Sequence, residues 1–390
     1  MFDKKILQNV DWLFLILLAL LLLVSMFVLA SASGNISDSQ PLYYVQRQIL
    51  FLSVGVIALL GTALFNYRKL GNYVVPAYVV LMIMLIAVFF APHPSWALSD
   101  AKRAFYIGHY MFQPSELGKL IMIVTLARFL SQRQERIAEW STFFGVFGIM
   151  AAPMVLVLIE PDLGSTLVFG FTMLVMMWLS GIPRRRILVL LAIIALLVGL
   201  IFLDLWVATD GFEHMIEELP VPLPMHTYQL NRLIIFINPE MDPLNEGYQL
   251  IQSKVAIGSG GLLGKGYGMG SQVQSDFVPY HHTDFIFSVV GEELGFIGSI
   301  GVLLLLLFLL LRIMYIANKS SDLFGSLIVS GIVAMLFFQI FVNIGMTMGI
   351  MPVTGITLPF FSYGGTSLLI NMMAMGLVLS VNMRREIKIF

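Results

Sequence analysis

The sequence predicts an all-α integral membrane protein of about ten transmembrane helices. Of its 390 residues, 58% are hydrophobic and only 12% are charged. The mean hydropathy is +0.90, and such a composition is outside the usual range for a soluble domain of this length. Long uncharged apolar runs, such as 13–29 and 187–203, match the roughly 30 Å hydrocarbon core of a bilayer. We therefore expect a single polytopic membrane domain over residues 1–390.

Lys4 and Lys5 precede the first apolar run, which is too long for a signal-peptide core and lacks a small-residue cleavage site. This run is therefore expected to be the first span. Apolar length and periodicity then predict ten spans. Their ranges are 12–33, 47–66, 72–91, 113–131, 144–160, 163–181, 186–207, 284–313, 322–350 and 363–383.

Basic residues predict the orientation, because Lys and Arg are enriched in cytoplasmic loops. Fifteen of the 22 Lys and Arg residues fall on one side when loops are assigned alternately, so both termini are expected in the cytoplasm. The remaining seven are expected at or near the outer side and are candidates for function. They are Arg47, Lys102, Arg103, Lys119, Arg232, Lys254 and Lys265.

Cysteine is absent, which excludes disulfides, zinc–thiolate sites and cysteine nucleophiles. The net charge of -1 says little by itself, because the distribution of charge matters more in a membrane protein. No nucleic-acid partner is expected.

A large extracytoplasmic loop, 208–283, is predicted between the seventh and eighth spans, and loops of this length are usually functional or disordered. Its acidic part, 210–219, is consistent with a short interfacial helix. Its second part, 247–270, has eight glycines in 24 residues, which permits close backbone approach to a ligand or, alternatively, a flexible surface loop. A nucleotide-binding P-loop is excluded because Ser259 and Gly266 stand where that motif needs Gly and Ser or Thr.

Asp284 lies at the mouth of the eighth predicted span. From spacing alone an N-cap role is favoured, since Asp before an apolar helical run satisfies exposed amides. A reactive carboxylate is the other interpretation, because a partly apolar mouth raises the pKa of a carboxyl group. Glu292 and Glu293 lie about 12 Å further along, so at least one of them is expected to face a polar cavity or a basic partner at that depth.

Polar residues also mark the fourth span and the turn after the fifth. Glu116 and Lys119 are three residues apart, so they form either an ion pair within one helix or part of a pocket. Glu160 and Asp162 flank Pro161 in a tight external turn, which is also explained by a proline stop and a cap. The broken apolar segment 351–366 is expected to be a re-entrant loop or a cavity wall.

Five motifs in order along nearly the whole chain resemble the SEDS family of shape, elongation, division and sporulation proteins. Lys254-Val-Ala and Gly264-Lys265-Gly266 are more similar to the elongation member, RodA, than to the division member, FtsW. The five motifs are Gln113-Pro-Ser-Glu116, Glu160-Pro-Asp162-Leu-Gly, Gly247-Tyr-Gln with Gln252-Ser-Lys-Val-Ala-Ile-Gly-Ser-Gly-Gly, His282-Thr-Asp-Phe-Ile-Phe-Ser with Gly291-Glu-Glu-Leu-Gly, and Ser362-Tyr-Gly-Gly.

The resemblance implies a peptidoglycan glycosyltransferase of the bacterial cytoplasmic membrane that polymerises lipid II during cell elongation and rod-shape maintenance. It implies a class B penicillin-binding protein as partner, together with other membrane proteins of the elongation complex. Asp284 matches the family's essential aspartate, Glu116 and Lys119 match required polar residues, and Arg47 and Arg103 match basic residues near the external cavity. Ala104 stands where relatives commonly have Trp, so contacts of that aromatic group are in doubt.

The expected chemistry is general-base catalysis by Asp284, with undecaprenyl diphosphate as the leaving group. Basic residues are expected to hold the diphosphate. No metal site is predicted, although a divalent cation, Mg²⁺ or Mn²⁺, beside Glu160 or Asp162 is an option. The expected substrate-binding residues are Arg47, Arg103, Glu116, Lys119, Lys254 and Lys265; the expected supporting residues are Glu160, Asp162, Glu292, Glu293 and Ser362.

Two other functions fit parts of the pattern. A lipid II flippase would also use intramembrane charges such as Glu116, Lys119, Glu292 and Glu293, but no inverted repeat is evident and the polar motifs concentrate outside. A scaffold without chemistry predicts that Asp284 is replaceable.

Overall fold

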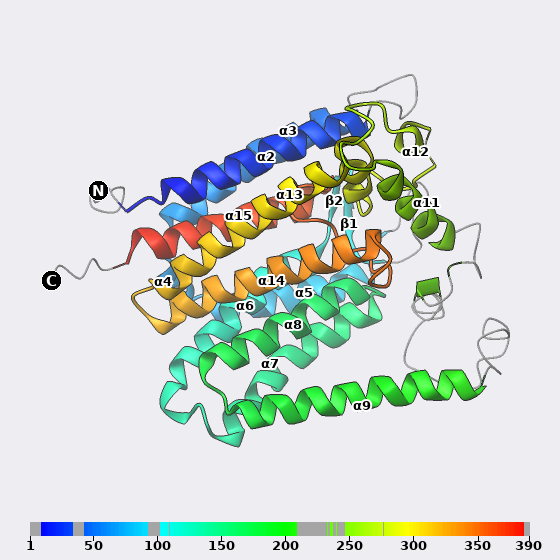
Figure 1. Ribbon diagram of the computed structural model, residues 1–390. Helices are drawn as coiled ribbons and strands as arrows, with labels where there is room; N and C mark the ends of the chain where they lie inside the picture. Colours follow the sequence, from blue (N-terminus) through cyan, green and yellow to red (C-terminus); the bar gives the residue numbers. More distant parts are fainter. Residues whose placement is uncertain are drawn as a thin grey trace.

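The computed structural model describes residues 9–33, 43–92, 102–108, 110–208, 232, 235–236, 239, 246–275 and 277–385. These residues are almost entirely helical (Figure 1), which confirms the predicted fold class. A helix lies in each of the ten predicted ranges. These helices are α2 (Trp12–Ala32), α3 (Tyr43–Leu64), α5 (Val74–Val88), α6 (Pro114–Gln132), α7 (Trp140–Ile159), α8 (Leu163–Ser180), α9 (Arg184–Ala208), α13 (Ile286–Asn318), α14 (Leu323–Thr347) and α15 (Gly365–Met383).

Within the described residues, seven helices are long and apolar enough to cross a membrane, namely α2, α3, α7, α8, α13, α14 and α15. α14 and α15 form the centre of the bundle, since 67% and 83% of their apolar windows are buried, against 22% for α3. α14 packs against α6, α8, α13 and α15, and α15 packs against α3. The exposed apolar faces of the outer helices are typical of a protein surrounded by lipid.

Polar contacts fix the end of the bundle where α2 begins and α15 ends. Asp11 caps α2 by accepting from the amide of Phe14 at 3.0 Å and pairs with Arg312 of α13 at 2.9 Å. Asn382 of α15 donates to the carbonyl of Asn9 at 2.7 Å. The Asp11 cap and ion pair join α2 to α13, and the Asn382 hydrogen bond joins α15 to the segment before α2.

Short elements gather at the opposite end (Figure 1). They are a hairpin of β1 (Phe105–Ile107) and β2 (Tyr110–Phe112), α11 (Glu246–Ser259) and α12 (Ser271–Gln274). The hydroxyl of Thr366 donates to the carbonyl of Met111 at 2.8 Å, which holds the hairpin against the start of α15. α4 (Tyr67–Leu70) and η1 (Gln134–Arg136) connect helices elsewhere. Most of the first part of the predicted loop 208–283, including 210–219, lies outside the described residues.

The glycine-rich segment after α11 is inserted into a break in α13. Gly295 leaves the helical conformation with φ 66° and ψ −164°, and the segment pairs with the broken helix: the amide of Lys265 donates to the carbonyl of Glu292 at 3.0 Å, and that of Phe296 to the carbonyl of Gly261 at 2.9 Å. A Cβ on Gly264 would lie 2.1 Å from the carbonyl oxygen of Glu293. At Gly264, the close approach expected toward a ligand is therefore made to the protein's own backbone.

The irregular segment between α14 and α15 is buried in protein, as irregular backbone at membrane depth must be. Phe360 and Phe361 are buried, and the carbonyl of Phe360 accepts from Ser25 of α2 at 2.5 Å. The hydroxyl of Ser362 donates to the carbonyl of Thr283 at 2.7 Å, so this segment also supports the residues just before α13.

Candidate active site

Asp284 is not a helix cap. The N-cap position of α13 is occupied by Phe285, and no side chain caps the helix there. The N-cap interpretation favoured by spacing is therefore wrong, because the helix begins two residues after the aspartate. Its main chain is nevertheless fixed: the amide of Asn343 in α14 donates to the carbonyl of Asp284 at 2.8 Å and to that of Ile356 at 2.7 Å. The carboxylate is left available for another role.

Charged groups from separate parts of the chain surround the carboxylate of Asp284. Burial raises the pKa of Asp284 above its ordinary value, the positive charges of Arg103 and Arg232 lower it, and the negative charge of Asp162 raises it. Gly355 lies beside this group: a Cβ there would be 3.5 Å from Nη1 of Arg232 and 3.6 Å from Oδ2 of Asp284. The site thus combines a partly accessible carboxylate with two guanidinium groups.

The turn between α7 and α8 contributes two carboxylates. Asp162 caps α8 through the amide of Ser165 at 3.0 Å, and its other oxygen accepts from Gln113 at 2.7 Å and Ser115 at 3.1 Å. Glu160 is fully buried, and neither of its carboxylate oxygens has a hydrogen-bond partner within the described part of the chain. Burial, with a smaller contribution from the charge of Asp162, raises the pKa of Glu160 to about 8. Glu160 is therefore mainly protonated at neutral pH.

Glu116 and Lys119 form the ion pair within α6 that the sequence allowed. Nζ of Lys119 is 2.6 Å from Oε1 of Glu116, and their side chains are 4% and 13% exposed. The neighbouring hydroxyl of Ser115 links this turn of α6 to Asp162. Glu116 is therefore next in sequence to Ser115, which hydrogen-bonds Asp162, and the charge of Asp162 acts on Asp284.

Arg47 belongs to an aromatic cluster that extends to His282, two residues before Asp284. Its guanidinium lies 4.3 Å from the ring of Tyr43 and 5.4 Å from that of Tyr110, and its side chain hydrogen-bonds Tyr363. Tyr363 in turn contacts His282, with 6.3 Å between ring centroids. Burial, with a smaller contribution from His281, lowers the pKa of His282 to about 4, so this ring is neutral at pH 7.

Lys254 and Lys265 are not among the charges that act on Asp284. Lys265 pairs with the buried Glu292 at 2.6 Å, and Glu292 also accepts from the amides of Gln272 and Val273 in α12 at 2.8 and 3.0 Å. Lys254 is exposed and lies beside Gly349. Lys265 and Glu292 therefore anchor the glycine-rich segment, and the need for a basic partner at Glu292 is confirmed.

Glu293 also supports the loop. It accepts from the hydroxyl of Ser31 in α2 at 2.5 Å and from the side-chain amide of Gln274 at 3.2 Å. Together the two glutamates join α2, α12 and α13.

Two residues at the site were not assigned a role there from the sequence: Arg232 was counted only among the outer basic residues, and Asn343 was missed. Arg232 was visible as a basic residue on the outer side but had no motif around it, and Asn343 had the signal of an amide inside an apolar helix, where polar residues are functional or hydrogen-bonded.

Across the described residues, no group of three His, Asp or Glu side chains is placed to hold a metal ion. At the Glu160 turn, Asp162 already accepts three hydrogen bonds.

A family model for cell cycle proteins of the FtsW, RodA and SpoVE type matches residues 11–387. Stage V sporulation protein E of Bacillus subtilis (strain 168) is 35% identical over 376 residues, covering 95% of this chain and 96% of that protein. Peptidoglycan glycosyltransferase MrdB of Escherichia coli (strain K12) is 34% identical over 379 residues, covering 97% and 95%.

Two solved structures share the fold. A chain from a study of polymerization and crosslinking by a peptidoglycan synthase complex matches with a TM-score of 0.77 and 31% identity, covering 96% of this chain and 97% of that one. Thermus thermophilus rod shape determining protein RodA matches with a TM-score of 0.68 and 30% identity, covering 96% and 97%. The RodA-like interpretation is thereby supported, and the chain belongs to the FtsW, RodA and SpoVE family of membrane-embedded cell cycle proteins.

Proposed function

We propose that this protein is a peptidoglycan glycosyltransferase that polymerises lipid II at the outer face of the bacterial cytoplasmic membrane, with Asp284 as general base. The observation on which this depends is the placement of Asp284, which is free of any capping role and faces Arg103 and Arg232. The names of the relatives support the same reaction class.

The reaction needs a base that is deprotonated near neutral pH yet still basic enough to take a proton. Asp284 would remove the proton from the 4-hydroxyl of an acceptor GlcNAc. The resulting oxygen nucleophile attacks C1 of the donor MurNAc, and the bond from C1 to undecaprenyl diphosphate breaks with inversion. Burial, which raises the pKa of Asp284, supports this role, but a general base contributes only about 10²- to 10⁴-fold.

The remaining rate enhancement would come from positioning and from charge stabilisation of the leaving group. Arg103 and Arg232 are suited to this because guanidinium groups bind phosphate oxygens through paired hydrogen bonds. They act on Asp284 from different segments, so a diphosphate between them would also be close to the base. Arg47, held by Tyr43 and Tyr110, is a third candidate. Lys254 and Lys265 are weaker candidates than the sequence indicated.

The expected orientation places the termini in the cytoplasm and Asp284 outside, in accord with the distribution of Lys and Arg. The partner proposed is a class B penicillin-binding protein, supported by the likeness to a complex in which polymerization and crosslinking are coordinated. Elongation is the favoured process because of the RodA-like motifs.

Purified protein supplied with lipid II distinguishes this function from a flippase and from a scaffold. Wild-type protein, with its partner present, should form glycan strands, and Asp284→Ala should not. The control Glu135→Gln, at an exposed carboxylate in η1, should polymerise normally. Lipid II movement across vesicles without polymer would indicate the flippase, and neither activity would indicate the scaffold.

A further inference from the structure

A groove separates the first turns of α7 and α9, at the end of the bundle away from Asp284. Its volume is about 680 Å³, within the range of about 300–1,000 Å³ common for ligand pockets. α7 begins in this groove at Trp140 and ends beside Glu160, 20 residues later. The start of the groove at Trp140 therefore lies roughly 30 Å along α7 from Glu160, at 1.5 Å per residue.

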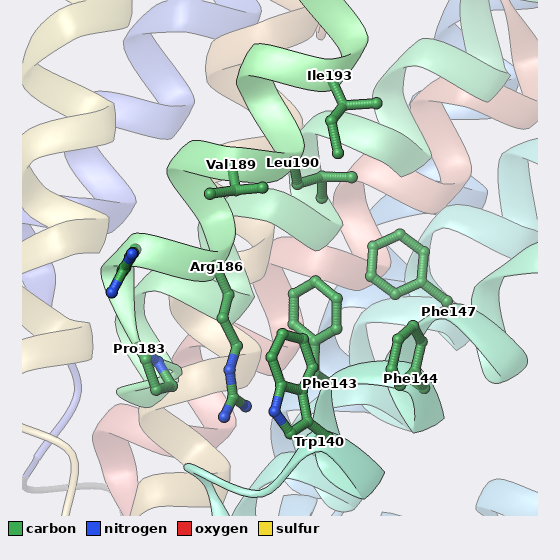
Figure 2. Close-up of a pocket in the computed structure, with 10 residues that line it drawn as sticks. Trp140, Phe143, Phe144, Phe147, Pro183, Arg186, Val189, Leu190 and Ile193 are labelled. Carbon is green, nitrogen blue, oxygen red and sulfur yellow. The ribbon is translucent and has the colours of Figure 1, made fainter.

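The walls of the groove are apolar and aromatic. Figure 2 shows the rings from α7 lying between that helix and the aliphatic side chains of α9. The lining consists of Trp140, Phe143, Phe144 and Phe147 on one side and Pro183, Val189, Leu190 and Ile193 on the other, together with Arg185 and Arg186. Such a surface fits a flexible hydrocarbon chain.

Arg186 gives the lining of the groove an unsatisfied donor. Its guanidinium lies 3.9 Å from the ring centroid of Trp140, and its Nη1 is buried without a hydrogen-bond partner in the part of the chain that the structure describes. A buried N–H of a charged group without an acceptor is costly. An anionic oxygen at this position would satisfy it.

We propose that this groove binds one anionic phospholipid, with an acyl chain along the aromatic wall and the phosphate on Arg185 and Arg186. Both halves of the ligand are required by the site, because a soluble anion would leave the apolar wall empty and a lipid without net negative charge would leave the charges of Arg185 and Arg186 uncompensated. Trp at the level of the headgroups and basic side chains near them are typical of such sites. The lipid would brace α9 against α7, and this role is independent of the proposed reaction.

The matched control is Arg184, which belongs to the same basic run but is absent from the groove lining. Its guanidinium lies 5.1 Å from the ring of Trp178 instead. Arg184→Gln therefore removes the same charge from the same stretch of chain without touching the groove.

The test is native mass spectrometry of the delipidated full-length protein in neutral detergent, titrated with palmitoyl-oleoyl phosphatidylglycerol or the matching phosphatidylcholine. Wild-type protein and Arg184→Gln should bind one phosphatidylglycerol about tenfold more tightly than phosphatidylcholine. The double variant Arg185→Gln, Arg186→Gln should lose this preference. Equal binding of the two lipids by wild-type protein, or an unchanged preference in the double variant, would overturn the proposal.

A second variant tests the hydrocarbon half of the site and covers the case in which the double variant does not fold. Leu190→Trp fills the groove and keeps all three arginines, so phosphatidylglycerol should bind at least about tenfold more weakly. Glycerol phosphate should not displace the bound lipid. Unchanged lipid binding by Leu190→Trp, or full displacement by glycerol phosphate, would show that only the headgroup is recognised and would reject the groove.

Discussion

The side-chain amide of Asn343 donates to the main-chain carbonyl of Asp284 at 2.8 Å, and the same amide reaches Ile356 at 2.7 Å. The central helix α14 therefore sets the position of the aspartate directly, and it sets the irregular segment beside it at the same time. Asn343 is fully buried, so both carbonyls depend on it for a partner.

Asn343→Ala should lower polymerisation and stability together. Loss of the two bonds leaves buried carbonyls unpaired, at a cost of about 1–3 kcal/mol, and frees the peptide of Asp284 to move. We expect at least a tenfold loss in kcat, on the scale that small misplacement of a catalytic group causes. Asn382→Ala is the control, since it removes a similar bond to Asn9 at the other end. Asn382→Ala should have a lower melting temperature and an unchanged kcat. Equal losses of kcat in both variants would contradict the role of Asn343 in positioning Asp284.

The pH dependence of polymerisation should respond to Arg232. The base must be deprotonated, so activity is present above the pKa of Asp284 and is lost as the pH falls through it. Arg232 lowers that pKa, and Arg232→Gln should therefore move the acidic limb of the pH–rate profile to higher pH. The exposed Arg136→Gln should leave the limb in place. A limb that stays fixed in Arg232→Gln would show that another group sets it.

Glu160 predicts that stability falls as the pH rises, whereas the polymerisation activity that depends on Asp284 is lost as the pH falls. Its pKa is about 8 in the folded protein against 4.5 as the ordinary value, so between these pH values the folded state binds more protons than the unfolded state. Stability from this group should be greatest below about pH 4.5, fall as the pH rises, and level off above about pH 8.

Glu160→Gln keeps the shape of the neutral acid and should abolish that fall, raising stability at pH 8 by a few kcal/mol. Thermal melting in detergent at pH 5, 7 and 8.5 measures the effect. Glu135→Gln, which is exposed, should not alter the dependence. If the melting temperatures of Glu160→Gln and wild-type protein changed with pH in the same way across this range, a raised pKa of Glu160 would be refuted.

The insertion of the glycine-rich segment into α13 predicts unequal costs for two alanine substitutions. Gly264 and Gly261 both have positive φ, 80° and 56°, but only Gly264 would place a Cβ against Glu293, at 2.1 Å; nothing lies within 4 Å at Gly261. Gly261→Ala should cost about 1–2 kcal/mol, and Gly264→Ala about 3 kcal/mol or more. Equal losses of melting temperature would mean that the segment does not pack into the break.

The positions of the helices were predictable because apolar length and lack of charge are local properties of the chain. The first predicted span, 12–33, differs by one residue from α2, and 163–181 differs by one from α8. The interruption at Gly295 was not predicted, since the span 284–313 was taken as one continuous helix. That break depends on hydrogen bonds with residues 27 to 35 positions earlier, which no local pattern contains.

The site was predictable only in part, for the same reason. Asp284 and Arg103 were identified from motifs, and the structure brings them together. Lys265 was chosen for its charge and side of the membrane, but its partner is Glu292. The sign of a charge and its side of the membrane can be predicted from the sequence. Which polar groups meet is decided by the packing of distant segments, as for Arg232 and Asn343.

The most direct test of the account is the initial rate of lipid II polymerisation by Asp284→Asn, measured beside the wild-type protein at matched concentration and with matched melting temperature. Asn keeps the size of the side chain and cannot act as the base, so the rate should fall about 10²-fold or more. Glycan strands formed by Asp284→Asn at the wild-type rate would contradict the assignment of this carboxylate as the catalytic base.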